Sequence, residues 1–497
     1  MGHHVADADP LPLRIFFIPF FATGHLIPLV DVARLFAARG VDSTILVTPT
    51  NAALIRVTVD AAAAGGLPLR TLIYPFPSAE SGLPPGVENI SDLPSEESYK
   101  IDLAAPFTRP AHEQLLRLHR PDAVVSDVHF PWTALVARDL CVPRFLFTAV
   151  GLFPVSVVTS VRQHRPHAGV ARDDEPVLVP DLPHPVFLTR SELPEFLRRD
   201  VPLRRFRDEY MEAETASAGV IVNSFAEMEA SYSEYYLRAR GLRSWFVGPV
   251  SLATSNAGLR GGGDAAASAN RTRCLSWLSA QAPRSVVYAC FGSWCRFTNE
   301  QLREMAQGLE ASGRPFLWVV REEDGQEWMP QGFEQRVEGR GLVLPGWAPQ
   351  VDVLGHEATG AFLTHCGWNS LLEGAAGGMP MVTWPLSTEQ FINEKLVVAV
   401  LQVGVRASER CRSTVDDEPH VVRAEELARA VGKIMDGGEE AEGIRRRARE
   451  LGEKAGQAVR EDGSSVKGLS DLIAEIRDWQ GKKKDVAADV VGSYHQP

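Results

Sequence analysis

The chain has 497 residues, which corresponds to roughly two to four domains of ordinary size. Its composition, with 45% hydrophobic and 23% charged residues, is typical of a globular protein with sizeable cores. The net charge of −12 argues against a nucleic-acid or anionic-membrane surface, so an anionic ligand would be held by local donors.

The six cysteines are sparse, and they form no CxxC pair or Cys/His spacing typical of zinc. We therefore expect free thiols in a reducing compartment. The opening residues MGHHVADADP lack the apolar core of a signal peptide, and Ala6 stands where N-myristoylation requires Ser or Thr. The apolar run from Ile15 to Phe21 is too short to span a bilayer, so the sequence predicts a cytoplasmic protein without a membrane span.

The chain begins with the pattern of a βαβ unit. RIFFIPF is predicted to be a buried strand, FATGH a loop, LIPLVDVARLFAARG an amphipathic helix and STILVTP a second strand. Further strands are predicted at residues 121–127, 144–149, 219–225 and 244–250. This alternation indicates a doubly wound parallel sheet, in which ligands bind at the carboxyl ends of the strands.

Two regions of this half, residues 78–100 and 164–185, are rich in Pro, His and acidic residues. We interpret them as long surface excursions, either beside an acceptor site or simply solvated. After a Gly-, Ala- and Ser-rich linker the strand and helix pattern restarts, and residues 423–479 are expected to be mostly helix before a frayed tail. The expected divisions are an N-terminal domain, the linker, a C-terminal domain, and a C-terminal helix and tail that returns to the N-terminal domain: residues 1–250, 251–273, 274–475 and 476–497.

The stretch from Trp347 to Gln390 carries the densest set of polar and aromatic motifs. GAFLTHC is predicted to be a strand, NSLLEGAAG a helix whose first turn carries Asn and Ser, and MPMVTWP another buried strand. A helix that begins after a glycine turn presents unpaired N–H groups and a positive dipole end, which suits a diphosphate. His365, Asn369 and Ser370 gather there and supply further donors. Taken singly, each residue would also fit plain packing at a strand–helix junction.

This stretch resembles the signature box of plant secondary-product UDP-glycosyltransferases, glycosyltransferase family 1. WAPQ, HCGWNS, the Glu three residues after Ser370 and the closing EQ stand where that family has them. The resemblance extends over most of the chain and is strongest at residues 14–50, 121–132, 284–321 and 347–390. It implies an α/β protein of the GT-B fold, with two Rossmann-like doubly wound parallel-sheet domains facing across a cleft. It also implies a UDP-sugar donor, no cofactor and no metal.

His25 follows Gly24 in the loop after the first predicted strand. It could simply cap the next helix, but a neutral imidazole at a strand's carboxyl end can also abstract a proton at cytosolic pH. PFFATGHLIPLVDVARLFAARGV is similar to the N-terminal pattern of the family, whose GH histidine is the general base. The resemblance therefore implies that His25 is the catalytic base.

Asp127 ends another strand of the same predicted sheet, so its carboxylate is expected to approach His25. A carboxylate on the far ring nitrogen would fix the tautomer and stabilise the imidazolium. SDVHFPW resembles the family's segment that bears this partner Asp. His129 is interpreted as incidental, and Asp122 as lying at the wrong end of the sheet.

The resemblance also implies the residues that bind the UDP-sugar: Thr148, Ser293, Trp347, Ala348, Gln350, His365, Trp368, Asn369, Ser370, Glu373, Glu389 and Gln390. Uracil is expected at Trp347 and Ala348, and ribose at Gln350 and Glu373. The departing UDP is expected at Ser293 beside Gly292 and at the donors of HCGWNS. Glu389 and Gln390 would bind sugar hydroxyls, and a closing Gln rather than His is associated in this family with glucose. Thr148 matches a Thr thought to touch the sugar, although a plain strand-end hydroxyl is the alternative.

Other classes of function fit the sequence less well. The letters of a DxD metal motif occur only at Asp7 and Asp9, in the polar N-terminal tail, and we interpret them as chance. A dinucleotide-dependent oxidoreductase would need GxGxxG after the first strand, where the chain has FATGHL. A non-catalytic nucleotide-sugar binding module would not need both His25 and Asp127.

The sequence therefore predicts a UDP-glucose-dependent inverting O-glucosyltransferase, acting on hydroxyls of small lipophilic plant metabolites such as flavonoids or related phenolics. A terpenoid, hormone or xenobiotic acceptor is the alternative. The expected partners are the UDP-sugar and a small-molecule acceptor, with no nucleic acid, and we expect a monomer.

Overall fold

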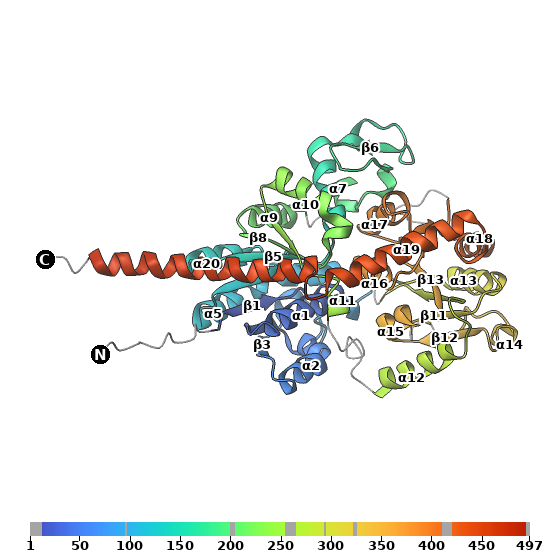
Figure 1. Cartoon of the computed structure of the whole chain (residues 1–497), viewed down its shortest axis with the longest axis horizontal. Helices are drawn as coiled ribbons and strands as arrows, with labels where there is room; N and C mark the ends of the chain where they lie inside the picture. The colour runs from blue at the N-terminus through green and yellow to red at the C-terminus, as the bar shows by residue number, and fades with distance from the viewer. Residues whose placement is uncertain are drawn as a thin grey trace.

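The computed structural model describes residues 12–94, 97–198, 204–253, 265–292, 295–321, 326–409 and 420–493. Two parallel sheets, each covered by helices, lie side by side, and the chain forms them one after the other (Figure 1). This architecture confirms the prediction of two successive α/β halves.

The first sheet has seven strands in the order β3-β2-β1-β4-β5-β8-β9, all parallel. Its central strands are apolar and β-branched or aromatic, as expected of strands that are covered on both faces. Their bounds are β1 (Arg14–Ile18), β2 (Asp42–Val47), β3 (Leu69–Ile73), β4 (Ala123–Asp127), β5 (Arg144–Thr148), β8 (Gly219–Val222) and β9 (Ser244–Phe246).

Helices cover both faces of this sheet. The longer ones are α1 (Thr23–Ala37), α2 (Pro49–Ala64), α5 (Arg109–His119), α6 (Trp132–Asp139), α7 (Leu152–His164), α9 (Arg204–Thr215) and α10 (Ala226–Arg240). The two predicted excursions, residues 78–100 and 164–185, contain short elements between irregular segments: α3 (Ser78–Ser81), η1 (Ile90–Asp92), the start of α4 (Tyr99–Ala104), η4 (Pro166–Gly169) and β6 (Val177–Val179). Other short elements follow the excursions in the chain: η3 (Ala105–Thr108), β7 (Val186–Leu188), which pairs with β6, η5 (Arg190–Glu192) and α8 (Glu195–Arg198).

The second sheet has six parallel strands in the order β12-β11-β10-β13-β14-β15. The strands are β10 (Val286–Cys290), β11 (Phe316–Val320), β12 (Gly341–Pro345), β13 (Thr359–Thr364), β14 (Met381–Thr383) and β15 (Gly404–Arg406). The helices of this half are α12 (Ala265–Ser279), α13 (Asn299–Ala311), α14 (Phe333–Arg336), α15 (Gln350–Gly355), α16 (Trp368–Ala376), α17 (Gln390–Lys395), the π-helix η8 (Leu396–Val400), α18 (Ala424–Met435) and α19 (Glu439–Ala458).

The last helix, α20 (Ser464–Ser493), leaves the second half and runs back beside β9 of the first sheet, as the long red helix of Figure 1 shows. It begins earlier than the predicted residue 476. It also continues to Ser493 through a segment that the sequence predicts to be frayed. The described parts of the predicted linker, residues 251–273, are helical, since α11 (Val250–Ala253) reaches into its start and α12 into its end. Residues 254–264 lie outside the described residues.

The two halves share a packed interface. The indole of Trp368, the first residue of α16, lies against Gly151, and its Nε1 donates a hydrogen bond of 2.9 Å to the carbonyl of Asn223. Nearby, Lys395 Nζ lies 2.8 Å from Glu192 Oε1 in a largely buried ion pair across the same boundary. These contacts bring the loops that follow β1 and β13 together.

Candidate active site

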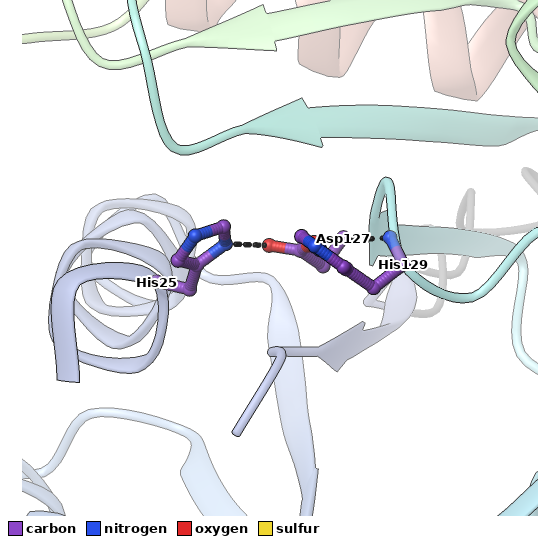
Figure 2. Close-up of side chains that lie close together, drawn as sticks. All are labelled: His25, Asp127 and His129. Atoms are coloured by element: carbon purple, nitrogen blue, oxygen red, sulfur yellow. Dashed lines mark hydrogen bonds and ion pairs between the residues drawn. The ribbon is translucent and has the colours of Figure 1, made fainter. Parts of the chain in front are cut away.

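His25 and Asp127 lie side by side at the carboxyl ends of neighbouring strands. His25 lies in the first turn of α1, directly after β1, and Asp127 is the last residue of β4, which pairs with β1. The distance from His25 Nδ1 to Asp127 Oδ2 is 2.7 Å, and Figure 2 shows the ring pointing at the carboxylate. The structure therefore brings together the two residues that the sequence predicts to form a pair. By contrast, Asp122 accepts from the backbone N–H of Arg14 at the opposite end of the sheet.

Each residue of this pair stabilises the charged form of the other. Burial alone would lower the pKa of His25, but the carboxylate of Asp127 outweighs it and raises this pKa, with contributions from Glu389 and Asp102. Burial would raise the pKa of Asp127, yet His25 and His129 hold it well below its usual range. An ionised carboxylate only accepts, so the proton of neutral His25 lies on Nδ1 and the lone pair on Nε2. Nε2 is thus the nitrogen that can act as a base.

His129 is not incidental, which corrects the prediction. Its Nδ1 lies 2.6 Å from Asp127 Oδ1, and its backbone N–H donates to the same oxygen at 3.1 Å. Its ring stacks on Phe20 with the centroids 3.9 Å apart. The Asp-x-His spacing at the end of a strand was the available signal, because Asp side chains there accept from the backbone two residues on.

Three ligand atoms of His25, Asp127 and His129 lie within 4.8 Å of one another, so a metal is chemically conceivable. However, both His–Asp distances are 2.7 Å or less. Two ligands of a tetrahedral zinc ion at about 2.0–2.1 Å would lie about 3.3 Å apart. A metal would have to push these groups apart and replace both hydrogen bonds, so the arrangement fits a hydrogen-bonded cluster better.

The N-terminus of α16 faces this pair from the second half. Asn369 Nδ2 donates a hydrogen bond of 2.7 Å to the carbonyl of Gly24, the residue before His25. Its Oδ1 is buried and accepts no hydrogen bond within the described residues. The Nδ1 atom of His365 is likewise buried and has no partner there, although the residue as a whole is partly exposed. Unpartnered buried polar atoms at a helix N-terminus indicate a site built for a polar ligand.

The backbone around His365 has no room for larger side chains. A Cβ at Gly367 would lie 2.4 Å from the His365 ring, and a Cβ at Gly292 would lie 3.0 Å from it. Gly292 also has a φ of +74°, which favours glycine. Burial lowers the pKa of His365 to about 4, so the ring is neutral at pH 7 and can donate one N–H. Ser293 lies outside the described residues, and its predicted contact stays a prediction.

Gln350 joins two elements of the predicted nucleotide site. Its Nε2 donates to Ser370 Oγ at 3.1 Å and to Glu373 Oε2 at 2.8 Å, so α15 and α16 are tied together. Just before it in the chain, Trp347 is partly exposed and Ala348 is buried. The structure therefore joins the two residues expected at ribose, Gln350 and Glu373, to each other and to Ser370 in the first turn of α16.

The residues predicted to meet the sugar lie where the loop after β14 ends, because Glu389 is the N-cap of α17 and Gln390 is its first residue. Gln390 Oε1 accepts from the backbone N–H groups of Leu386 and Ser387 at 2.9 and 3.1 Å, which closes this loop. Glu389 lies close enough to raise the pKa of His25. The loop thus presents residues of the second half to the catalytic pair.

Two predicted binding residues have other contacts. Trp368 was grouped with the UDP-sugar-binding residues, but its indole packs into the first half against Gly151. Thr148 donates to the carbonyl of Val150 at 3.0 Å, which fits the alternative of a strand-end hydroxyl. The sequence did not indicate where the indole of Trp368 packs, because the residues that it contacts, Gly151 and Asn223, lie more than 100 residues away in the chain.

This structure belongs to a recognisable class: two parallel-sheet halves, with a His–Asp pair on the first and a glycine-flanked helix start on the second. The model of the family "UDP-glucoronosyl and UDP-glucosyl transferase" matches residues 250–418. The scopoletin glucosyltransferase of Nicotiana tabacum is 42% identical over 470 residues, covering 93% of this chain and 98% of the relative. The UDP-glucose flavonoid 3-O-glucosyltransferase 7 of Fragaria ananassa is 43% identical over 477 residues, covering 94% and 96%.

Solved structures agree. Glycyrrhiza uralensis UGT73P12, complexed with glycyrrhetinic acid 3-O-monoglucuronide, superposes with a TM-score of 0.90 at 37% identity, covering 98% of this chain and all of the other. Phytolacca americana UGT2, complexed with UDP-2fluoro-glucose and pterostilbene, gives a TM-score of 0.77 at 29% identity, covering 94% of this chain and all of the other. The chain belongs to the plant UDP-glycosyltransferase family and has the GT-B fold, which confirms the resemblance.

Proposed function

We propose that the protein is an inverting O-glucosyltransferase that moves glucose from UDP-glucose to a hydroxyl of a small phenolic compound. The observation that carries this proposal is the meeting of the two halves at Gly24. The catalytic pair of the first half lies there against the α16 N-terminus of the second, joined by the 2.7 Å hydrogen bond from Asn369. A base and a diphosphate site in contact are what sugar transfer to a hydroxyl needs.

In the proposed reaction, Nε2 of His25 takes the proton of the acceptor hydroxyl. The acceptor oxygen attacks C1 of the glucose from the face opposite UDP, and the bond from C1 to the diphosphate oxygen breaks. Asp127 stabilises the imidazolium that forms. The α16 N-terminus with His365, Asn369 and Ser370 would stabilise the charge of departing UDP, and fixed donors in a buried site are well suited to this.

The donor and acceptor are proposed from two kinds of support. Gln390 is the last residue of the stretch that resembles the family's signature box, and the family associates a Gln at this position with glucose. Its side-chain carbonyl Oε1 holds the loop, so that its side-chain N–H groups remain for a ligand. The relatives in Nicotiana tabacum, Fragaria ananassa and Gentiana triflora are described as acting on scopoletin, flavonoid and anthocyanin. The bound triterpenoid glycoside in the Glycyrrhiza uralensis structure favours a terpenoid acceptor as the second candidate.

The proposed catalysis uses no metal or other cofactor. Its support is the hydrogen bonding of His25, Asp127 and His129 at distances too short for an ion between them. Transfer is therefore expected to continue after extensive treatment with EDTA, measured as the initial rate of UDP release in chelated buffer. Loss of activity that returns only with added divalent metal would contradict this.

No helix in the described part of the chain is long and apolar enough to cross a membrane. A cytoplasmic location fits this finding and the use of a nucleotide-sugar, and we include it in the proposal together with a monomeric state.

The test is His25→Ala. Incubation with UDP-glucose and a panel of flavonoids, coumarins and triterpenoids is expected to give a hexose mass increment with the wild type. The variant is expected to lose at least about 10²-fold in kcat, because general base catalysis typically contributes that much or more. UDP should still bind, as measured by calorimetry, since its site lies on the other half.

His164→Ala is the matched control. His164 also forms a His–Asp contact, with Nε2 2.9 Å from Asp181 Oδ2, but this pair is exposed and its carboxylate is not that of Asp127. This variant should retain wild-type transfer. Wild-type turnover in His25→Ala would refute the assignment of the base. Donor binding without turnover on any acceptor would favour the non-catalytic binding protein.

A further inference from the structure

The carboxylate of Asp127 is shared by two histidines. Oδ2 faces Nδ1 of His25 at 2.7 Å, and Oδ1 faces Nδ1 of His129 at 2.6 Å (Figure 2). Asp127 has no solvent exposure. Since an ionised carboxylate can only accept, each histidine must present an N–H to it. The orientation and the charge of this one buried group are therefore set from both sides.

The surroundings distinguish the two rings. His129 is stacked on Phe20, its ring contacts Tyr210, and its Nε2 lies 3.7 Å from Asp102 Oδ1 on α4. That nitrogen is thus directed at a carboxylate and not at the second half. His25 lies close enough to the loop after β14 to be influenced by Glu389. Of the two rings, the described contacts place only His25 beside the second half, next to the Gly24 carbonyl that accepts from Asn369, so His129 acts on the reaction through Asp127.

We propose that His129 is a positioning residue of the glucosyl transfer: its Nδ1–H holds Oδ1 of Asp127, so that Oδ2 stays aimed at His25 and the carboxylate charge is divided between the two rings. The inference rests on the proposed function of His25 as the base. By this inference His129 joins His25 and Asp127 as a third residue of the cluster, and Asp102 lies beyond His129.

Removing the His129 donor has two expected consequences. Of its described contacts, Oδ1 would keep only the backbone N–H of His129 at 3.1 Å, so the carboxylate could turn away from His25 and kcat would fall. The negative charge of Asp127 would also act more strongly on His25, because it would no longer be shared with His129, and this favours the imidazolium form of His25. The charged groups around His25 are Asp127, Glu389 and Asp102, all acidic, so nothing among them offsets this change. The acidic limb of the kcat/KM profile should therefore move to higher pH.

His129→Phe and His129→Asn separate the donor from the ring. Phe keeps a flat ring on Phe20 but donates nothing, while Asn supplies an N–H near the position of Nδ1. His129→Phe is expected to lose about 10-fold in kcat with little change in the KM for UDP-glucose, and to move the acidic limb up by about half a unit. His129→Asn is expected to recover most of the lost kcat and to reverse the shift.

The same shift is measured without turnover by NMR. The Cε1 resonance of His25 is titrated in the wild type and in both variants, with UDP bound, so a wrong acceptor or wrong reaction leaves this readout intact. Melting temperature and UDP affinity report folding, and His129→Leu, which also lacks a donor, replaces His129→Phe if that variant does not fold. A wild-type kcat and an unmoved His25 titration in the donor-less variant would overturn the proposal. So would equal impairment of His129→Phe and His129→Asn.

Discussion

Asp127 is a buried carboxylate whose every described contact comes from a donor. His25 and His129 meet its two oxygens, and Nη2 of buried Arg144 donates to its backbone carbonyl at 3.4 Å. Burying a charge is costly unless it is paired and hydrogen-bonded, and here these contacts offset that cost. The charge is retained for its effect on His25, because burial would otherwise lower the pKa of that ring.

Asp127→Asn tests this effect. The change removes the charge that raises the pKa of His25 and leaves the burial that lowers it, so the base should become protonated only at lower pH. The acidic limb of kcat/KM is therefore expected to move to lower pH, opposite to the shift for His129→Phe. The rate is expected to fall by about 10²- to 10³-fold, since the imidazolium loses its counter-charge. A limb that stays in place or moves to higher pH would contradict the assignment of Asp127 as the dominant charge.

At the scale of elements, the start of α16 has two tasks. Its N-terminus is the proposed diphosphate site, and its first side chain anchors the second half to the first. Trp368 is 3% exposed, and its ring fills the space that a side chain at Gly151, the N-cap of α7, would need. The position of the donor site relative to His25 thus depends on this contact.

Gly151→Ala should displace the Trp368 ring. The added Cβ would lie 2.0 Å from Cη2 of Trp368, while Gly151 has an ordinary φ of −74°, so the effect is steric and not conformational. We expect the free energy of unfolding to fall by about 2–3 kcal/mol, in line with other overpacked sites, and the KM for UDP-glucose to rise. Urea denaturation and donor kinetics measure the two effects.

Gly169→Ala is the control for that change, because a Cβ at Gly169 meets no atom within 4 Å. It should leave both quantities near the wild-type values. If Gly151→Ala were as stable as Gly169→Ala, the anchoring role of Trp368 would be wrong.

The sequence predicts well the features that depend on local pattern. The βαβ start, the strand ends that carry His25 and Asp127, and the helix start after Gly367 follow from short runs of residues with fixed spacing. Trp368 and His129 were misjudged because their roles depend on partners far away in the chain or on the exact turn after a strand. The elements inside the excursions were missed because helices such as α3, with four residues, are too short to show a clear period.

At the scale of the whole molecule, α20 joins the end of the chain to its first sheet. Leu469, Leu472, Ile473 and Ile476 are 5% exposed or less and belong to the same core as Trp245 of β9. Arg243 and Glu475 add an ion pair of 3.0 Å at the surface. Full burial of such side chains contributes about 1.5–3 kcal/mol each, so the four together are comparable with the 5–15 kcal/mol that stabilises a typical protein.

Truncation before residue 464 is therefore expected to leave the first half unable to fold. The protein should be found in the insoluble fraction, or should show no cooperative unfolding transition. Truncation after residue 482 keeps all four apolar contacts and is expected to give a soluble protein with wild-type transfer activity. Equal behaviour of the two truncations would contradict the role of α20.

A point substitution tests the contribution of the apolar face of α20 without removing the helix. Ile476→Asp places a charge at a position with no solvent exposure, whereas Lys482→Asp places the same charge on the exposed side of the same helix. Burial of an unpaired carboxylate is strongly unfavourable, so Ile476→Asp should lower the free energy of unfolding by at least about 3 kcal/mol. Lys482→Asp should change it by less than about 0.5 kcal/mol.

Because α20 contacts the first sheet while α19 before it packs on α16, the loss of this contact in Ile476→Asp should also raise the KM for UDP-glucose. An unchanged donor KM in a destabilised Ile476→Asp would show that α20 stabilises the first half without positioning the second.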